Sequence, residues 1–392
     1  MDPVTNPFAP GAGSPPPELA GRDDLLEAAR ICVERTRIGR PARSLLLVGL
    51  RGVGKTVLLE RMRQNAERSG IATLRLEAPE GRSLPSLLAP HLKVSLIGFS
   101  RTEKARHLAE RALRGLASFA KAFSVKYRDL ELGLGYEPEP GLADNGDLEQ
   151  DLTALLVAVA EATRAAGSAL AVFIDELQYV PEDQLAALIT ALHRCAQVPL
   201  PVTMIGAGLP QLRARTGKAK SYAERLFEFP AVGALNDTYA TQAIERPLQE
   251  EGVAIEPEAV RDILSATQGY PYFLQEWCKH AWDVAAGSPI TRLDVEVASR
   301  VAIAALDASF FRVRLDRLTP SERRYLRAMA SLGPGPHRSG DIADALSRTV
   351  TSLAPTRAKL IDKGMVWSPA HGDTAFTVPL FDEFMMRAAV PE

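Results

Sequence analysis

One eight-residue segment has a clear chemical role, Gly49-Leu50-Arg51-Gly52-Val53-Gly54-Lys55-Thr56. It matches the pattern GxxxxGK[ST], with an apolar run from Ser44 to Val48 before it and a helical pattern after it. Glycines let backbone N–H groups turn inward around an anion, and the helix that follows presents its positive end to the same anion. Lys55 can reach the β- and γ-phosphates of a nucleotide, and the Thr56 hydroxyl can ligate Mg²⁺. The segment predicts a site for ATP and Mg²⁺.

Two acidic residues, Asp175 and Glu176, follow the apolar run Ala171-Val172-Phe173-Ile174. At the carboxyl end of a buried strand, Asp175 is placed to hold Mg²⁺. Glu176 can act as the general base that polarises a water molecule. An exposed helix start would also explain Asp-Glu after a strand, but the complete phosphate-binding segment favours the catalytic interpretation.

Short apolar strands alternate with helical patterns from residue 19 to about 232, which predicts an α/β fold with a parallel sheet. Strands are expected at 44–48, 71–76, 169–174 and 202–206. Residues 80–150 interrupt this alternation and are interpreted as an insertion, with a helix over 101–123, a strand or ribbon over 125–136 and a loop over 137–147. Residues 1–18 are rich in Pro and Gly and predict a flexible arm.

The composition of the chain excludes several classes of protein. A net charge of −2 over 392 residues gives no global attraction for nucleic acid or anionic membranes, so any DNA binding must come from a local patch. The three cysteines are far apart and form no CxxC, as expected for free thiols in the cytoplasm. No apolar run reaches the roughly 18 residues of a membrane helix. A cytoplasmic protein that does not contact membranes is therefore expected.

The chain resembles the P-loop ATPases of the AAA+ (ASCE) type. Within them it is similar to the archaeal and bacterial ATPases related to the Orc1/Cdc6 initiators and to the signalling ATPases called STAND. The resemblance covers about residues 18–392 and rests on four motifs: GLRGVGKT, VFIDELQ, Ala20-Gly21-Arg22-Asp23 and Gly269-Tyr270-Pro271-Tyr272-Phe273-Leu274. It implies that Gly21 and Arg22 lie beside the adenine and that Tyr270 and Pro271, in a helical lid, approach the nucleotide from the other side. A simple helix-to-helix turn would also explain Gly269-Tyr270-Pro271.

Two departures from the family pattern indicate slow turnover. After the strand at 202–205 the family carries a polar residue near the γ-phosphate, whereas this chain has Gly206-Ala207-Gly208 and nothing polar until Gln211. The lid also lacks the arginine that many relatives place on its third helix. Arg225 resembles the family's arginine finger, which acts on the γ-phosphate of a neighbouring subunit and adds positive charge in phosphoryl transfer. A surface arginine without such a role is the alternative.

The region from 233 to 309 is predicted to be all helical, with helices at 237–251, 257–267, 271–285 and 291–309. Residues 310–392 predict three helices and a two-stranded ribbon, an order that resembles a winged helix-turn-helix closely. This last segment has 12 Lys or Arg against 9 Asp or Glu, a modest basic excess that leaves both DNA binding and a protein-interaction role open. The residues that could meet phosphates or bases are Arg348, Thr349, Ser352, Arg357, Lys359 and Lys363.

The expected organisation is therefore an arm (1–18), a P-loop ATPase domain (19–232), a helical lid (233–309) and a winged helix (310–392). The expected activity is slow hydrolysis of ATP to ADP and phosphate, driving a regulator or loader associated with double-stranded DNA. A STAND-like switch whose winged helix contacts a protein partner is the alternative, and a nucleotide-binding scaffold without turnover is a third. The sequence leaves open whether the protein forms homo-oligomers.

Overall fold

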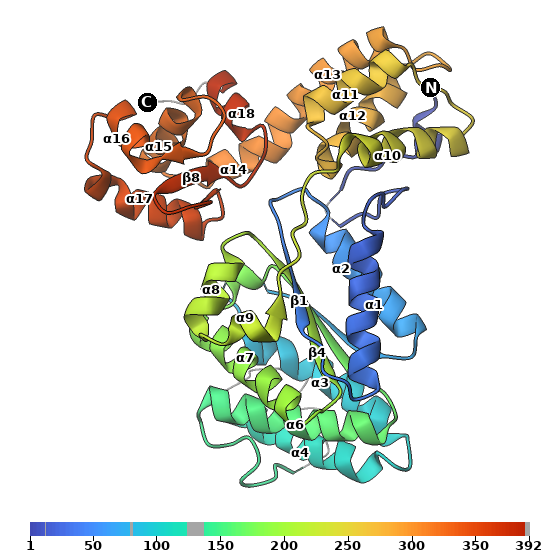
Figure 1. Ribbon diagram of the computed structural model, residues 1–392, viewed down its shortest axis with the longest axis vertical. Helices are drawn as coiled ribbons and strands as arrows, with labels where there is room; N and C mark the ends of the chain where they lie inside the picture. The colour runs from blue at the N-terminus through green and yellow to red at the C-terminus, as the bar shows by residue number, and fades with distance from the viewer. Residues whose placement is uncertain (12, 79–80, 124–136, 389–392) are drawn as a thin grey trace. The chain divides into compact units, whose positions relative to one another are not determined.

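The computed structural model describes residues 1–11, 13–78, 81–123 and 137–388, which form two compact units (Figure 1). The unit called the sheet unit below comprises Arg22–Val48 and Lys55–Ala231. The helical unit combines three stretches of chain, Met1–Gly21, Gly49–Gly54 and Val232–Glu392. The phosphate-binding segment thus belongs to the helical unit up to Gly54, and Lys55 and Thr56 belong to the sheet unit.

In the described part of the sheet unit, five parallel strands form one sheet in the order β2-β3-β4-β1-β5. The strands are β1 Ser44–Val48, β2 Ala72–Glu77, β3 Leu170–Asp175, β4 Val202–Gly208 and β5 Phe227–Glu228. Strand β3, which pairs with β2 on one side and β4 on the other, is buried along its whole length, as its unbroken apolar sequence predicts for a strand covered on both faces. Parallel strands bring their carboxyl ends to one edge, so the end of β3 lies between the ends of β2 and β4.

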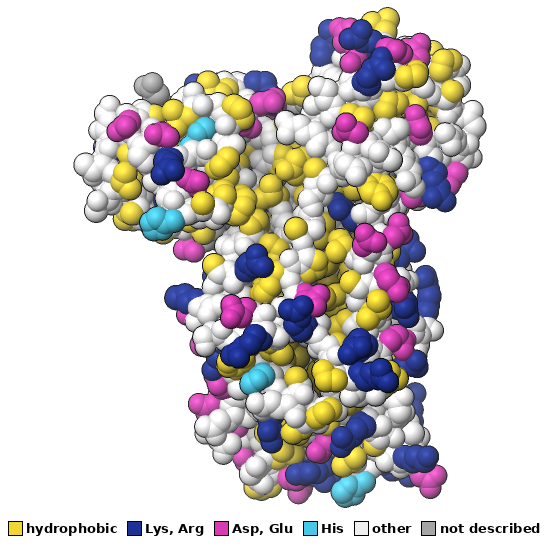
Figure 2. Space-filling view, viewed as in Figure 1, with side chains coloured by type: hydrophobic (Ala, Val, Ile, Leu, Met, Phe, Trp, Pro, Cys, Tyr) yellow, Lys and Arg dark blue, Asp and Glu magenta, His cyan; other side chains and the backbone are white. Residues whose placement is uncertain are grey.

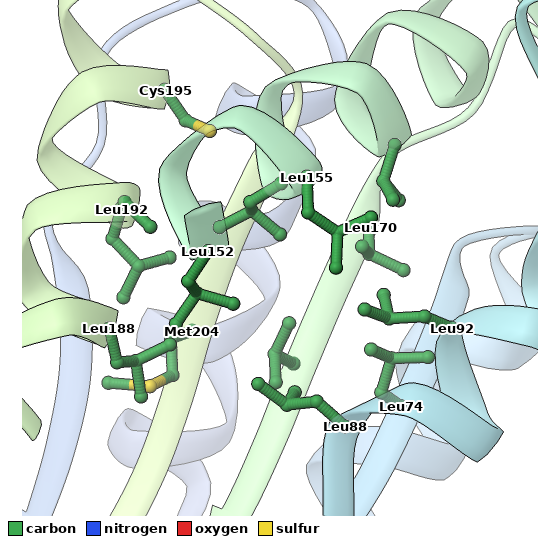
Figure 3. Close-up of a cluster of buried hydrophobic side chains, with 14 of the residues drawn as sticks. Leu74, Leu88, Leu92, Leu152, Leu155, Leu170, Leu188, Leu192, Cys195 and Met204 are labelled. Atoms are coloured by element: carbon green, nitrogen blue, oxygen red, sulfur yellow. The ribbon is translucent and has the colours of Figure 1, made fainter. Parts of the chain in front are cut away.

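Helices cover both faces of this sheet. The described helices of the sheet unit are α1 Asp23–Arg37, α2 Lys55–Arg68, α3 Leu84–Ser100, α4 Arg106–Ala122, α6 Leu148–Ala165, α7 Glu182–Gln197, α8 Leu212–Ala219 and α9 Ala223–Leu226, with the 3₁₀ helix η2 Leu177–Tyr179. Leu170 of β3 joins the core beneath α3, α6 and α7 (Figure 3). Phe173 is also buried but does not belong to that cluster, as expected where alternate residues of a strand divide between the two faces. Helices α1 and α2 pack on the second face.

The predicted insertion at 80–150 contributes the helices α3 and α4, which pack on each other and on α6. Its predicted helix over 101–123 is confirmed as α4, whose buried side is rich in alanine and leucine. The strand or ribbon predicted over 125–136 lies outside the described residues.

The helical unit begins with the 3₁₀ helix η1 Pro3–Thr5 and continues after residue 232 with α10 Asp237–Glu250, α11 Pro257–Thr267, α12 Pro271–Val284 and α13 Arg292–Leu306. These four helices confirm the predicted all-helical stretch. In place of the expected flexible arm, the first residues pack against these helices. Phe8 is 2% exposed within their core, and the indole N–H of Trp282 donates to the Asp2 carbonyl at 2.8 Å.

The last part of the helical unit contains α15 Pro320–Ser331, α16 Ser339–Ala345, α17 Val350–Asp362 and α18 Phe381–Arg387. Three short strands, β6 His337–Arg338, β7 Val366–Trp367 and β8 Asp373–Phe376, form an antiparallel sheet in the order β6-β8-β7. Helix α15 starts at Pro320, a first-turn position where proline's missing N–H costs no intrahelical hydrogen bond. Its first turn is closed by a capping box in which Thr319 and Glu322 satisfy each other's backbone N–H groups.

The predicted boundary at 309/310 falls inside η3, a single π-helical turn over Asp307–Phe311 that joins α13 to α14 Arg312–Asp316. The rings of Phe311 and Phe384 of α18 stack with their centroids 5.2 Å apart. The ring of Phe310 meets that of Phe273 of α12 edge to face, with the centroids 6.0 Å apart. One hydrophobic cluster therefore runs from α12 through η3 to α18. Among the described residues, no helix is both long enough and apolar enough to cross a bilayer.

Candidate nucleotide site

The carboxyl end of β3 and the start of α2 bring two oxygen ligands together. The Thr56 hydroxyl donates to Asp175 Oδ2 at 2.6 Å, and the Glu176 backbone N–H donates to Asp175 Oδ1 at 2.8 Å. Asp175 is 8% exposed, and this burial raises the pKa of its carboxyl above the usual range. The hydrogen bond from Thr56 and the charge of Lys55 oppose that rise, whereas the charge of Glu176 adds to it.

These two side chains suit Mg²⁺. Hydroxyl and carboxylate oxygens are the hard donors that Mg²⁺ prefers, and Mg²⁺ in phosphate-binding sites takes only one or two protein ligands with water and phosphate oxygens. Across residues 1–11, 13–78, 81–123 and 137–388, the structure holds no cluster of three or more His, Cys, Asp or Glu that would make a metal site without a nucleotide. The residues present therefore fit a metal that arrives with phosphate.

Lys55 is the first residue of α2 and is 8% exposed. The loop before it takes backbone conformations that favour glycine, with φ of +82° at Gly52 and +86° at Gly54. Within the helical unit this loop is contacted from two directions. The Tyr272 N–H donates to the Gly52 carbonyl at 3.1 Å, and the Arg51 N–H donates to the Thr377 carbonyl at 3.1 Å.

Glu176 adopts a left-handed backbone conformation, with φ of +53°, which is uncommon for a residue other than glycine. Its carboxylate accepts a hydrogen bond from the Gln178 side-chain amide, and its carbonyl accepts one from the Tyr179 N–H at 3.0 Å. Such strained residues are frequent at functional sites. Gln178 is a site residue that sequence reasoning missed, although it stands inside the motif VFIDELQ.

The residues expected near the adenine are divided between the units. Gly21 belongs to the helical unit, where its α-carbon lies so close to the Tyr239 ring that an added Cβ would come within 2.6 Å of it. Arg22 belongs to the sheet unit, where it is 9% exposed and burial lowers the pKa of its guanidinium. Tyr270 and Pro271 begin α12, with Tyr270 as the N-cap residue.

Arg225 lies on the short helix α9, directly before the edge strand β5, and its side chain is exposed. The structure thus places it where a partner could reach it. Among the described residues, no hydrogen bond or ion pair joins it to Asp175 or Glu176.

The six candidate DNA contacts do not form one free basic surface. The Arg357 guanidinium donates to Thr374 Oγ1, Ser368 Oγ and the Asp373 carbonyl, each at 2.8 Å. Lys363 pairs with the buried carboxylate of Glu322 at 2.7 Å. These two cations therefore tie α17 to its own domain.

The other four are more accessible. Arg348, Thr349 and Ser352 line a hollow of about 550 Å³ at the start of α17, and Lys359 is exposed on the same helix. On the face shown in Figure 2, basic and acidic side chains are interspersed over the sheet unit, so no broad basic field is visible there.

Comparisons with known proteins agree with this geometry. Residues 18–205 match the family model described as AAA ATPase domain, and residues 308–385 match a domain of unknown function. A solved structure of a Walker-type ATPase from Pyrococcus abyssi is 14% identical, covers 94% of this chain and 96% of its own, and superposes with a TM-score of 0.57. The fold is that of the P-loop AAA+ ATPases.

Two further solved structures have similar coverage but superpose too loosely to support a conclusion. The RuvB Holliday junction branch migration motor of Thermotoga maritima is 16% identical, covers 95% of this chain and 97% of its own, and has a TM-score of 0.44. The Orc1 protein of Aeropyrum pernix in complex with DNA is 17% identical, covers 95% and 93%, and has a TM-score of 0.45. Comparison with curated proteins gives no significant match.

Proposed function

We propose that this protein is a slow, Mg²⁺-dependent ATPase that acts as a nucleotide-driven regulator or loader associated with DNA. The observation that carries the ATPase part is the 2.6 Å contact between the Thr56 hydroxyl and Asp175, at the junction of a phosphate-binding segment and the end of a buried strand. The match of residues 18–205 to an AAA ATPase domain supports the same assignment.

In this proposal each residue has one task. Lys55 and the N–H groups of the loop 49–54 hold the β- and γ-phosphates, and Thr56 and Asp175 hold Mg²⁺. When bound, Mg²⁺ neutralises charge on the phosphate oxygens. Glu176 orients a water molecule and accepts its proton as the water oxygen bonds to the γ-phosphorus, while the bond to the β–γ bridging oxygen breaks and ADP leaves.

The helices α10–α13 serve in this proposal as the lid. Two features support it: Tyr270 and Pro271 open α12, and the Tyr272 N–H, one residue further on, donates to the Gly52 carbonyl of the phosphate-binding loop. ATP binding is proposed to change the conformation of these helices. The protein is proposed to be cytoplasmic. The arginine-finger role of Arg225 requires that it form homo-oligomers.

The DNA association rests on the fold of residues 310–392. Helices α15, α16 and α17, followed by strands β7 and β8, have the order of a winged helix-turn-helix, in which α17 takes the place of the recognition helix. Arg348, Thr349, Ser352 and Lys359 are the contacts this interpretation retains.

A second candidate function has its own support. Because Arg357 and Lys363 are engaged within the domain, the basic surface is smaller than the sequence indicates, which favours a STAND-like switch whose winged helix contacts a protein partner.

Phosphate release from Mg-ATP, compared with release in excess EDTA, tests the ATPase assignment. Turnover should require Mg²⁺, and Asp175→Asn should lower it at least tenfold, since the amide cannot replace the charged ligand. Equal release with and without Mg²⁺ would refute the proposed site.

A further inference from the structure

Gln178 links the proposed general base to a neighbouring strand. It lies in η2 and is 6% exposed. Its side-chain Nε2 donates to Glu176 Oε2, and its Oε1 accepts from the Leu209 backbone N–H at 3.1 Å. One planar amide thus connects the carboxylate at the end of β3 with the residue that follows β4.

The chemistry of the two partners explains why an amide stands here. A backbone N–H can only donate and a carboxylate can only accept, so the linking side chain must offer one acceptor and one donor. The same two partners determine which end of the amide is oxygen and which is nitrogen. A carboxylate at this position would lose the donor, and an apolar residue would lose both groups.

Strand β4 is shaped to admit this side chain. A Cβ added at Gly208 would lie 2.9 Å from Gln178 Oε1, and one added at Gly206 would lie 2.2 Å from Leu177 Cδ1. The two glycines therefore leave room for η2 to pack on β4. The glycines that leave Gly206-Ala207-Gly208 without a polar side chain are therefore the same residues that make room for the polar side chain of Gln178.

We propose that Gln178 is a positioning residue for ATP hydrolysis. It holds the Glu176 carboxylate in one orientation and anchors it to the carboxyl end of β4, where it supplies the polar side chain that Gly206-Ala207-Gly208 does not. This inference rests on the proposed ATPase function. A correctly placed general base contributes about 10²–10⁴-fold to a reaction, and a base free to rotate loses part of that factor.

The test uses the full chain and Gln178→Met, which has nearly the same length and volume but neither hydrogen bond. We expect kcat for phosphate release to fall about 10–100-fold, while KM and the calorimetric Kd for Mg-ATP stay close to those of the wild type. The melting temperature should fall only slightly, because the buried Leu209 N–H loses its acceptor. Combining Gln178→Met with Glu176→Gln should give no further loss of kcat, because Gln178 acts through Glu176.

Gln211→Met is the matched control. Gln211 is the other glutamine close to the end of β4, and its side-chain oxygen is buried without accepting a hydrogen bond within the described chain. Its replacement should leave kcat unchanged.

Three results would overturn the inference. Unchanged kcat in Gln178→Met, with an active wild type, refutes the role of Gln178 alone. A parallel loss of ATP affinity and melting temperature shows a merely structural role. A wild type that binds ATP but releases no phosphate refutes the ATPase proposal together with this inference.

Discussion

The two acidic residues at the end of β3 lie in different surroundings. Asp175 is buried and accepts hydrogen bonds from Thr56 and from a backbone N–H, whereas Glu176 is partly exposed and its carboxylate is held by a neutral amide. Neighbouring carboxylates in unlike environments can take unlike roles. This contrast supports a metal ligand at Asp175 and a base at Glu176.

At this scale we expect Lys55→Ala to abolish measurable ATP binding. The substitution removes a flexible, buried cation from the phosphate site, where charge-assisted hydrogen bonds are strong. Calorimetry with Mg-ATP provides the measurement, and Lys93→Ala, an exchange of the same type on α3, is the control. Undiminished affinity in Lys55→Ala would remove the basis for the site.

Glu176→Gln should keep ATP binding and lose most hydrolysis, by about 10²-fold or more, because the amide preserves size but not basicity. Steady-state phosphate release and calorimetry on the same preparation separate the two effects. Equal, non-zero release in variant and wild type would exclude Glu176 as the base. Zero release in both would favour a nucleotide-binding scaffold.

The residues of this site differ in how far the sequence could predict them. Lys55, Thr56 and Asp175 follow from spacing, because a strand, a tight loop and a helix leave little freedom in where these side chains lie. Gln178 could not be predicted, because its role depends on the left-handed turn at Glu176 and on the space left by Gly208 in a distant strand.

At the scale of elements, the N-terminal arm shows how composition can hide a packing role. Proline and glycine in residues 1–18 indicate a chain without periodicity, and a single buried aromatic such as Phe8 leaves no periodic signal. Helices α10 to α13, in contrast, were predicted within a few residues because their apolar positions recur at helical spacing. The shared core across 309/310 was missed because helix patterns do not reveal which helices pack together.

Phe8→Ala should lower the free energy of unfolding by about 3 kcal/mol, the usual cost of emptying a buried phenylalanine site. Val4→Ala is the control on the same arm, since Val4 is 90% exposed and its change should stay within about 0.5 kcal/mol. Urea unfolding of both variants measures the difference. Equal stability would show that the arm adds nothing to the core.

Substitutions on and beside α17 should distinguish residues that contact DNA from residues that stabilise the fold. If the winged helix binds DNA, the logarithm of the binding constant falls with the logarithm of the salt concentration, with a slope of about −0.9 per phosphate contact. Replacing Arg348 and Lys359 by Gln should make that slope shallower by the amount that two contacts contribute. Arg357→Gln should instead destabilise the fold by about 1–3 kcal/mol, because its three partners lose their donor.

Fluorescence anisotropy of a labelled duplex with the full chain, from about 50 to 200 mM salt, measures the slope. An absence of binding at the lowest salt, with a stable protein, would decide for the protein-partner function.

At the scale of the whole molecule, Arg225 tests whether turnover requires assembly. If it acts on the nucleotide of a neighbouring subunit, the specific rate should rise with protein concentration, because a finger adds positive charge where the transition state needs it. Mixing Arg225→Ala with Glu176→Gln should restore part of the activity, since some contacts then pair an intact base with an intact finger.

Sedimentation measured alongside phosphate release supplies the oligomeric state for each mixture. Co-assembled variants that remain inactive would point to a role within one subunit. A wild type that stays monomeric, with a specific rate that does not change with protein concentration, would exclude the action of Arg225 on a neighbouring subunit. That result would favour the STAND-like switch.

The chain passes between its two units four times, at residues 21/22, 48/49, 54/55 and 231/232. No single cut in the sequence can therefore release either unit whole, and a fragment that starts at Val232 would lack Phe8 and the loop 49–54 from its own unit. Such interleaving favours cooperative unfolding, because each unit is completed by segments whose ends are anchored in the other. Calorimetric melting should accordingly give one transition, and protease nicks in the linkers should lower the stability of both units together.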